Sequence, residues 1–372
     1  MRVAMISKAL VVAAYQHKCE LIDKVLSECD DGSQLVTFVP PHWGAQKLES
    51  AYAKKHDLRV IPIRLSGNYH LHHYPTLAAE LAALKPDVVH IDEEPYNLAT
   101  FLAVRAARRI GARTVLFSWQ NIHRQYPPPF KWMEQWVLRH VDAAIMGSHE
   151  AQQVWKRKYP PLNTVIIPQF GVDEKHFAPI KRPPNQQKPF TIGFAGRLVP
   201  EKGLDLLLQA LASLPNTRAL IIGNGEQQAM LQSLSHTLNI AERVEFRPPL
   251  PSTRIREFYH EIDTLVLPSR TLPNWKEQFG RVLIEAMACG VPVVGSTCGE
   301  ISQVIGDGGL TFAENDVQAL VQALQQLSSN PNLCEIFASQ GRRRVLNHFT
   351  MHSIAKQTVQ VYTSVNELWV AG

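Results

Sequence analysis

The sequence predicts an α/β protein made of two Rossmann-like domains, each built on a doubly wound parallel sheet. Short apolar runs alternate with helical segments in both halves of the chain, as buried parallel strands and their crossover helices do. A Pro-rich stretch, residues 173–189, interrupts this alternation and is typical of a linker. Because ligands bind at the carboxyl ends of parallel strands, we expect the two domains to face each other across a cleft that holds the functional site.

The elements follow from apolar runs for strands and from helical periodicity for helices. Strands are expected at 2–6, 35–39, 58–63, 87–91, 113–117, 143–146 and 165–167, with helices from about residue 16 and at 75–84 and 98–109. Beyond the linker, strands are expected at 191–195, 218–222, 243–246, 264–267, 292–295 and 310–312. Helices are expected at 204–214, 227–238, 252–259, 282–288, 317–327, 333–346 and 351–368.

These elements define an N-terminal domain of residues 1–172 and a C-terminal domain of residues 190–350, joined by the linker 173–189. The last segment, 351–372, is predicted to be a helix that crosses back to the N-terminal domain.

Composition excludes several classes of protein. The chain has 372 residues, is 45% hydrophobic and 19% charged, and carries a net charge of +5, which excludes disorder and does not indicate nucleic-acid binding. Its five cysteines are scattered without a C-x-x-C pair, so a reducing, cytoplasmic location is expected. An apolar stretch near the N-terminus resembles a signal-peptide core, but Lys8 interrupts it. No run of about 18 apolar residues predicts a transmembrane helix.

The first candidate site motif is a Gly-rich strand end followed by two cations. Gly196 and Arg197 end a predicted strand, and Lys202 and Gly203 open the next helix. Glycine lets a ligand approach the backbone, and a helix N-terminus with Arg and Lys favours a diphosphate. Two surface cations on an ordinary turn explain the same residues equally well.

A G-x-G pair ends the next strand. Gly223 and Gly225 lack the third glycine of a dinucleotide-binding fingerprint, because Gln228 stands in its place. A tight turn is the simpler explanation, although the backbone also leaves room for a ligand.

Two glutamates flank a helix start. Glu277 precedes the start and Glu285 lies within the helix, while the amides of Phe279 and Gly280 at the start lack helical partners. A carboxylate among apolar neighbours needs a polar partner, so Glu285 indicates a bound diol such as a ribose. The alternatives are a charge partner for the helix N-terminus and a solvated helix face.

Together these motifs resemble the C-terminal half of the retaining glycosyltransferases of family 4, the "group 1" set with the GT-B fold. The likeness is carried by segments 194–203, 222–225 and 267–269, by a hinge-like stretch at 170–177, and above all by E-x-F-G-x4-E-A-M-A-x-G-x-P-V from Glu277 onward. The resemblance implies a nucleoside-diphosphate sugar as substrate, a metal-independent reaction without a cofactor, and retained anomeric configuration.

The same resemblance implies residue roles. Arg197 and Lys202 would hold the donor diphosphate, Glu285 the ribose, and Glu277 with the Phe279 and Gly280 amides the donor sugar. Glycines 196, 223 and 225 would line the donor, and Arg247 stands where the family commonly has a base-contacting glycine. The chain departs from the family in lacking a Gly-Gly pair after its first strand, and it has no D-x-D metal motif.

The N-terminal domain is expected to meet the acceptor, which could be a glycan, a lipid-linked molecule or a small molecule. The candidates follow predicted strands and are Tyr15, His17, Glu93, Asn121 and His123. A structural role is the more frequent explanation for each histidine.

The stretch Lys131–Arg139 is aromatic and basic, and Trp132, Trp136 and Arg139 can share one helix face. A helix packed into its domain is the more frequent explanation, and peripheral docking at the inner face of an anionic membrane is the alternative. Residues 1–180 carry 21 basic and 17 acidic side chains, so the small basic surplus of the chain lies on this side. Two other functions stay open: a non-catalytic binder of nucleotide sugars and a dinucleotide-dependent oxidoreductase.

Overall fold

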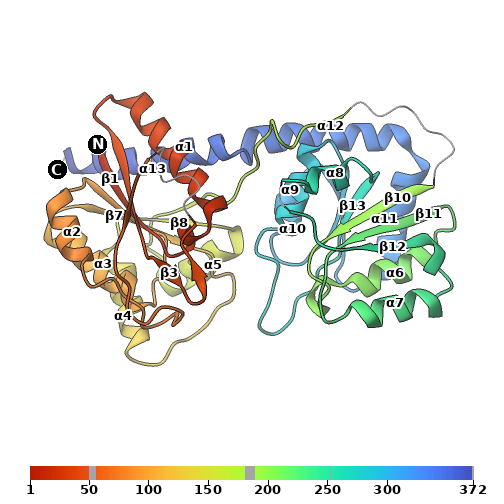
Figure 1. The fold of residues 1–372 in the computed structure, drawn as a ribbon, viewed down its shortest axis with the longest axis horizontal. Helices are drawn as coiled ribbons and strands as arrows, with labels where there is room; N and C mark the ends of the chain where they lie inside the picture. Colours follow the sequence, from red (N-terminus) through yellow and green to blue (C-terminus); the bar gives the residue numbers. More distant parts are fainter. Residues whose placement is uncertain (50–55, 181–188, 252, 371–372) are drawn as a thin grey trace. The chain divides into compact units, whose positions relative to one another are not determined.

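A computed structural model of the protein describes residues 1–49, 56–180, 189–251 and 253–370. These residues form two compact units (Figure 1). Unit 1 combines residues 1–170 with the C-terminal segment that begins at Met351, and unit 2 comprises residues 171–350. The boundary therefore falls two residues before the position expected from the sequence.

Unit 1 is built on a seven-stranded sheet in which all neighbouring strands are parallel. The strand order is β5-β2-β1-β6-β7-β8-β9. The strands are β1 (Arg2–Ile6), β2 (Gln34–Val39), β5 (Asp57–Val60), β6 (Val88–Ile91), β7 (Arg113–Ser118), β8 (Ala143–Met146) and β9 (Thr164–Ile166). The order changes direction between β1 and β6, which makes this pair the topological switch point of unit 1.

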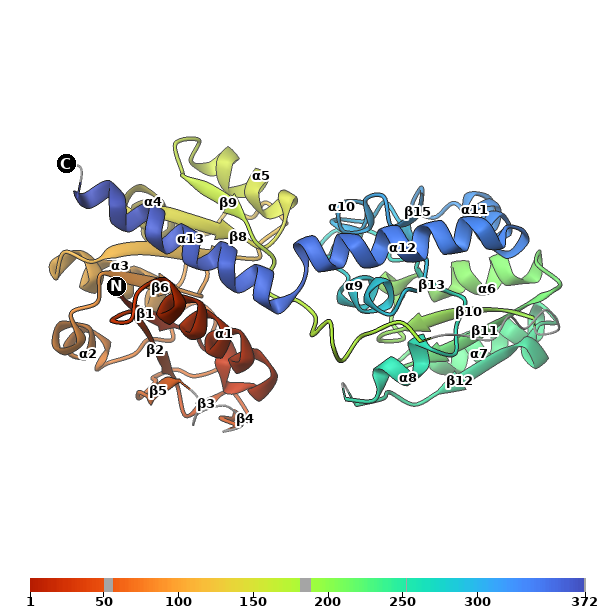
Figure 2. The ribbon, with the colours of Figure 1, turned by 90° about the horizontal axis from the view of Figure 1, so that it is seen from above.

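Helices cover both faces of this sheet, because its side chains alternate between two apolar clusters. Val3 and Met5 of β1 belong to the cluster of α1 (Ala13–Cys29) and α13 (Met351–Val370), whereas Ala4 and Ile6 belong to that of α2 (Leu77–Leu84) and α3 (Leu98–Arg109). Figure 2 shows α13 lying alongside α1. Two further helices, α4 (Phe130–His140) and α5 (His149–Lys158), complete the unit.

Unit 2 is built on a six-stranded parallel sheet in the order β12-β11-β10-β13-β14-β15. Its strands are β10 (Phe190–Ala195), β11 (Thr217–Ile222), β12 (Val244–Arg247), β13 (Thr264–Leu267), β14 (Val293–Ser296) and β15 (Gly309–Phe312). Here the order changes direction between β10 and β13. The switch point of unit 2 therefore lies at the carboxyl ends of these two strands.

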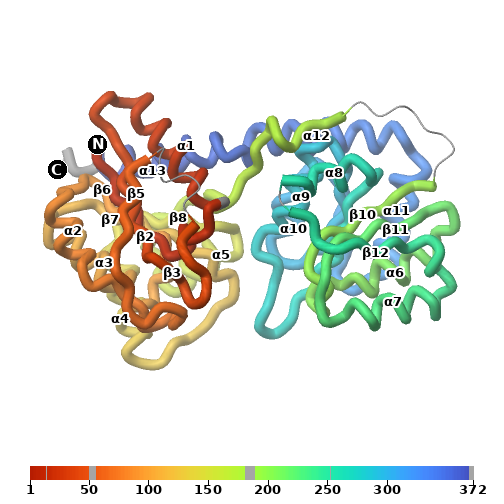
Figure 3. Tube along the Cα trace, in the orientation of Figure 1, coloured from red at the N-terminus to blue at the C-terminus, as the bar shows by residue number. Residues whose placement is uncertain are grey.

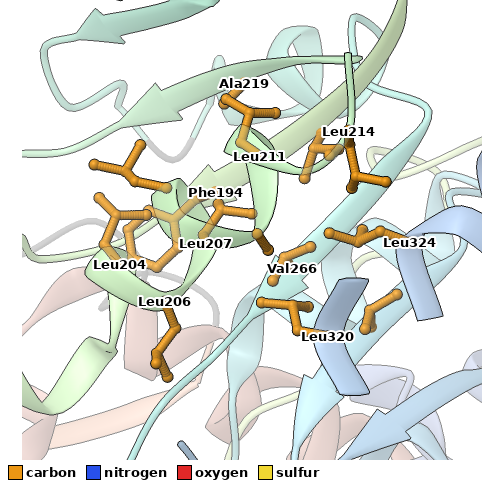
Figure 4. Packing of buried hydrophobic residues seen from close by; sticks show 14 of the residues in the cluster. Phe194, Leu204, Leu206, Leu207, Leu211, Leu214, Ala219, Val266, Leu320 and Leu324 are labelled. Carbon is orange, nitrogen blue, oxygen red and sulfur yellow. The ribbon is translucent and has the colours of Figure 1, made fainter. Parts of the chain in front are cut away.

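The helices of unit 2 also form two layers. On one face, Phe194 and Val266 pack against Leu207 of α6 and Leu324 of α11 (Figure 4). On the other face, Gly295 lies against α10, where an added Cβ would be 2.4 Å from Ile301. The helices are α6 (Leu204–Ala212), α7 (Gln228–Thr237), α8 (Ile255–Tyr259), α9 (Arg281–Ala288), α10 (Ile301–Ile305), α11 (Val317–Ser329) and α12 (Pro331–His348).

Several elements were not expected from the sequence. They are α5, α10 and the hairpin of β3 (His42–Trp43) and β4 (Gln46–Lys47), all short or weakly patterned. The 3-10 turns are η1 (Ala9–Val11), η2 (Pro200–Lys202) and η3 (Ala241–Arg243). No helix within the described ranges is long and apolar enough to cross a membrane.

The segment 173–189, which was predicted to be a linker, belongs to unit 2 where the structure describes it. Its first part packs within unit 2, because Arg342 of α12 donates hydrogen bonds to the carbonyl oxygens of Phe177 and Glu174 at 2.6 and 3.0 Å. Residues 181–188 lie outside the described ranges. Figure 3 follows the trace from this segment through unit 2 to α13, which belongs to unit 1 as the sequence led us to expect.

Candidate functional site

The predicted donor residues meet at the switch point of unit 2. The loop after β10 carries Arg197 and Lys202, and the loop after β13 carries Glu277. Because β10 and β13 are neighbours in the sheet, their carboxyl ends lie side by side. The topology therefore brings together two motifs that are 75 residues apart in the sequence.

Lys202 and Glu277 form the central ion pair of this site. Lys202 Nζ lies 2.5 Å from Glu277 Oε2, and the hydroxyl of Ser269 donates to the same oxygen at 3.0 Å. The Lys202 and Glu277 side chains are only 15% and 11% exposed. The ring of Trp275 faces the ammonium, with its centroid 5.1 Å from Nζ. A partly desolvated cation thus sits beside a carboxylate at the carboxyl ends of β10 and β13.

Arg197 is the solvent-facing cation of the site. Its side chain is 64% exposed, and its guanidinium lies 3.3 Å from the Glu201 carboxylate, four residues along the chain. An exposed pair of this kind contributes little to stability. Arg197 is therefore able to turn toward a ligand at small cost.

Glu285 is buried within α9. The Tyr259 hydroxyl donates to its Oε2 at 2.7 Å, and Arg281 Nε lies 2.7 Å from Oε1. Burial raises the pKa of Glu285 above its ordinary value, although Arg281 and Tyr259 oppose that shift. Tyr259 and Arg281 thus supply the polar partners that this buried carboxylate needs. Because a bound ribose is not required to satisfy it, ribose binding at Glu285 stays a prediction.

The glycines of the site are required by close backbone packing. A Cβ at Gly223 would lie 1.9 Å from the carbonyl oxygen of Gly196, and one at Gly225 would lie 2.3 Å from that of Leu198. The loops after β10 and β11 therefore press against each other. This contact accounts for the G-x-G pair without a ligand, which leaves its role in donor binding a prediction.

The start of α9 is set by Gly280, which adopts φ +79° at the helix N-cap. A Cβ there would be strained by the positive φ and would lie 2.9 Å from Leu267 Cδ2, so that leucine would have to shift. In the first turn of α9 the Leu283 N–H donates to the Gly280 carbonyl oxygen at 2.9 Å, whereas the amides before it lie too early in the helix for an i−4 partner. Phe279 precedes this turn and is buried against Phe349, with ring centroids 5.7 Å apart.

Arg247 is engaged by protein carboxylates. Its guanidinium lies 2.7 Å from Glu245 and 2.9 Å from Glu261, and these bonds raise its pKa. Its carbonyl oxygen accepts a hydrogen bond from the Gly223 N–H. The backbone of Arg247 therefore borders the glycine loop, while its side chain is held by the two glutamates.

In unit 1, Glu93 lies at the carboxyl end of β6, beside the end of β1. Its carboxylate pairs with the Lys8 ammonium and accepts from Tyr74 at 3.0 Å, and His72 Nε2 lies 3.2 Å away. Burial would raise the pKa of Glu93, but Lys8 and His72 outweigh it and lower the pKa to about 2. This network satisfies Glu93 internally, so the carboxylate orders the strand ends and has no need of an acceptor.

The other acceptor candidates make separate contacts of their own. Asn121 is buried and donates to Glu150, whereas His123 is exposed. His17 lies 3.1 Å from Glu20 on the same helix. Tyr15 packs on Phe170 with ring centroids 4.8 Å apart.

Sequence reasoning missed the residues that hold the predicted ones. Ser269, Trp275, Tyr259 and Arg281 contact the two glutamates or Lys202. Two of them were signalled without a role, Ser269 by its place in segment 267–269 and Arg281 by its i,i+4 spacing from Glu285. Within the described ranges, no group of three or more His, Cys, Asp or Glu side chains is arranged to hold a metal ion.

Comparisons with known proteins agree with this architecture. Residues 29–169 match the family model "Glycosyl transferase 4-like domain", and residues 177–344 match "Glycosyl transferases group 1". A D-inositol 3-phosphate glycosyltransferase of Mycobacterium marinum is 33% identical over 220 residues, which are 54% of this chain and 45% of that protein. The chain thus spans about half the length of the curated relatives it matches.

Solved structures match over nearly the whole chain. A sucrose-phosphate synthase from Thermosynechococcus elongatus has a TM-score of 0.70 at 20% identity, with 100% of both chains covered. Anabaena HepE in complex with UDP has a TM-score of 0.73 at 18% identity, covering 98% of this chain and 100% of HepE. With its two parallel-sheet units and both halves matched, the chain has the GT-B fold and belongs to the family of glycosyl transferases group 1.

Proposed function

We propose that the protein is a glycosyltransferase that moves a sugar from a nucleoside-diphosphate sugar to an acceptor. The observation that carries this proposal is the Lys202–Glu277 pair at the β10/β13 switch point, beside a Gly-rich loop and the N-terminus of α9. Such a place favours a ligand with both a diphosphate and hydroxyl groups. The M. marinum relative is named for glycosyl transfer, and HepE was solved with UDP, which supports a nucleotide sugar here.

We further propose a retaining, metal-independent reaction. As the bond to the anomeric carbon breaks, negative charge grows on the diphosphate, and Lys202, Arg197 and the α9 amides would stabilise it. The leaving phosphate would take the proton of the acceptor hydroxyl as that oxygen attacks the same face of the sugar. Glu277 would keep one N–H of the Lys202 ammonium on its Oε2, leave the other N–H groups to the phosphate, and accept hydrogen bonds from sugar hydroxyls with its second oxygen. The lack of a D-x-D motif supports a reaction in which side chains and amides hold the diphosphate.

A ligand panel tests this function first. Thermal shift with UDP, GDP, ADP and NAD identifies the base, because a ligand at 100 times its Kd adds about 2.7 kcal/mol to stability. Stabilisation by one nucleoside diphosphate supports the proposal. Stabilisation by NAD alone would instead favour the oxidoreductase, and donor binding without donor hydrolysis or transfer would favour a non-catalytic binder.

Substitutions at the site test the chemistry. We expect Lys202→Ala to lower transfer by about 10²- to 10³-fold, the effect of losing one preorganised charge-stabilising group. Glu285→Ala should abolish transfer too, while circular dichroism reports a folded protein. Lys24→Ala, at an exposed position on α1, is the matched control. Near-normal turnover of either site variant would contradict the assignment.

The proposed function also includes contact between α4, on the acceptor side of the protein, and a membrane. On α4, Trp132 is 64% exposed, and Lys131 and Arg139 are exposed as well, whereas Glu134 is buried and paired with Lys158 at 2.7 Å. Trp136 packs inward on Phe101. The outer side of α4 is therefore aromatic and basic, which favours peripheral contact with an anionic inner leaflet and a lipid-linked acceptor.

Co-sedimentation with phosphatidylglycerol vesicles, and with phosphatidylcholine vesicles for comparison, measures this contact. Each basic residue near an anionic surface contributes about 1 kcal/mol, so reversing Lys131 and Arg139 to Glu should weaken binding at least about tenfold. The control reverses Lys24 and Arg256, which are exposed on other helices. Vesicle binding that does not depend on lipid charge, or an absence of vesicle binding, would contradict the proposed membrane contact.

A further inference from the structure

We propose that Trp275 is a positioning residue of the donor site, whose indole holds the Lys202 ammonium in place for the diphosphate. The inference rests on the proposed function of that site and adds a residue for which neither the motifs nor the comparisons give a role. Lys202 Nζ lies 5.1 Å from the Trp275 ring centroid and 2.5 Å from Glu277 Oε2. The ammonium is therefore held by two side chains of one loop, two residues apart.

The loop that carries Trp275 is anchored at several points. Leu272 and Trp275 exchange backbone hydrogen bonds at 2.9 and 3.2 Å, which closes a tight turn. Before the turn, Arg270 donates its N–H to Glu201 O at 2.9 Å and its guanidinium to Asp205 at 2.6 Å. The indole is thus presented to Lys202 by a fixed backbone.

Two further bonds hold the turn from the other side. Thr271 donates its N–H and its hydroxyl to the Glu314 carboxylate at 2.5 and 3.0 Å. The loop is consequently tied to η2 and α6 through Arg270, and to the segment after β15 through Thr271. Lys202 lies at the end of η2, so the loop that carries the Trp275 ring is bonded to the turn that carries the Lys202 ammonium.

An aromatic ring suits this task better than a second carboxylate. An ammonium has three N–H donors, and Glu277 takes one of them. A ring attracts the cation through its face without accepting a strong hydrogen bond, so the remaining donors stay available to phosphate oxygens. A second carboxylate in this place would compete with the phosphate for the same donors and repel it.

A double-mutant cycle separates this role from direct contact with the ligand. Binding of the nucleoside diphosphate that the ligand panel selects is measured by calorimetry for wild type, Trp275→Leu, Lys202→Met and the double variant. We expect Trp275→Leu to weaken binding about 5- to 30-fold, the range of a partly desolvated cation–π contact. In the Lys202→Met background the same substitution should change binding less than about twofold, because its target is gone.

Kinetics and a conservative variant give a second readout. The KM for the donor should rise with little change in kcat, and Trp275→Phe should recover most of the loss because a phenyl ring keeps a weaker cation–π contact. Ile336→Ala, which truncates an exposed apolar side chain on α12, is the control. An equal loss in both Lys202 backgrounds, or wild-type affinity of Trp275→Leu, would overturn the inference.

Acylation of Lys202 by an N-hydroxysuccinimide ester needs neither ligand nor turnover. The rate of Lys202 acylation is measured by mass spectrometry relative to that of Lys24. It should be several-fold higher in Trp275→Leu than in the wild type. If the leucine variant does not fold, Trp275→Phe takes its place. An unchanged rate would contradict the proposed hold of the ring on the Lys202 ammonium. Wild-type nucleotide affinity of Lys202→Met would instead contradict the proposed function, because it would show that Lys202 does not hold the diphosphate.

Discussion

At the scale of single residues, both switch points carry a buried or half-buried lysine paired with a glutamate. Lys8 meets Glu93 in unit 1, and Lys202 meets Glu277 in unit 2. The two pairs differ in what surrounds them. Each ammonium lies against an indole ring, Lys8 on Trp43 and Lys202 on Trp275. Glu93, however, is fully buried among further donors that include Tyr74 and His72, whereas the Glu277 side chain is 11% exposed. Only the unit 2 glutamate is therefore open to a ligand.

The Glu93 network predicts a specific acid sensitivity. The pKa of Glu93 lies at about 2, below its ordinary value of 4.5, so its contribution to stability is present above pH 4.5 and is lost as the pH falls toward 2. Glu93→Gln should reduce stability at pH 7 by about 3–5 kcal/mol, because it leaves Lys8 buried without its anion. Urea unfolding at pH 7, 5 and 3 measures both effects.

The variant should also lose pH dependence, since glutamine does not titrate. Its unfolding free energy should fall less than that of the wild type between pH 5 and pH 3. Glu28→Gln, at a surface pair with Lys24, should behave like the wild type at every pH. Equal acid sensitivity of Glu93→Gln and the wild type would show that other carboxyl groups govern acid unfolding.

At the scale of elements, local patterns located most strands and helices but not the short ones. The strand run 143–146 was predicted with its observed ends, because its apolar residues stand between Asp142 and the Gly147–Ser148 pair. Helix α5 was missed although Ser148 accepts the N–H of Ala151 as its N-cap, and α12 begins at Pro331 because Asn330 caps it. These capping residues were the signals available in the sequence.

The packing of loops after β10 and β11 gives a prediction at this scale. Gly223→Ala would place a Cβ 1.9 Å from the Gly196 oxygen, so the two loops must separate. We expect a loss of stability of about 3 kcal/mol, the upper part of the usual range, and weaker binding of the nucleoside diphosphate. Urea unfolding and calorimetry measure the two quantities.

Gly111→Ala is the matched control, because Gly111 also has a positive φ, +75°, but has open space where its Cβ would lie. It should cost about 1–2 kcal/mol from backbone strain alone and leave nucleotide binding unchanged. If Gly223→Ala and Gly111→Ala lost the same unfolding free energy and bound the nucleotide equally well, the contact between the loops would add nothing to the cost of backbone strain.

At the scale of the whole molecule, the C-terminal helix completes the core of unit 1. Ile354 and Tyr362 of α13 are fully buried in the cluster that includes α1, and the Tyr362 hydroxyl lies 2.5 Å from His90 Nδ1 on β6. Unit 1 is therefore assembled from both ends of the chain, with unit 2 inserted between them.

Truncation at Thr350 should accordingly unfold unit 1, since it uncovers an apolar face of its sheet. A milder test compares two isoleucines. Ile354→Ala should cost about 2–5 kcal/mol, as a fully buried site does, whereas Ile336→Ala at a 50% exposed site should cost little. Differential scanning calorimetry measures both variants, and equal melting temperatures would show that α13 is dispensable to the core.

The sequence by itself determined the two parallel sheets, most of their strands, and the Glu277–Glu285 motif with the family it indicates. These depend on apolar runs and on spacings within one loop and one helix, which are local properties. Only the tertiary structure decided which charges meet. Lys202 meets Glu277 because β10 and β13 are sheet neighbours, and the Glu93 carboxylate pairs with Lys8 because β6 lies beside β1. Each outcome depends on strand order, which brings distant residues together and which no local pattern contains.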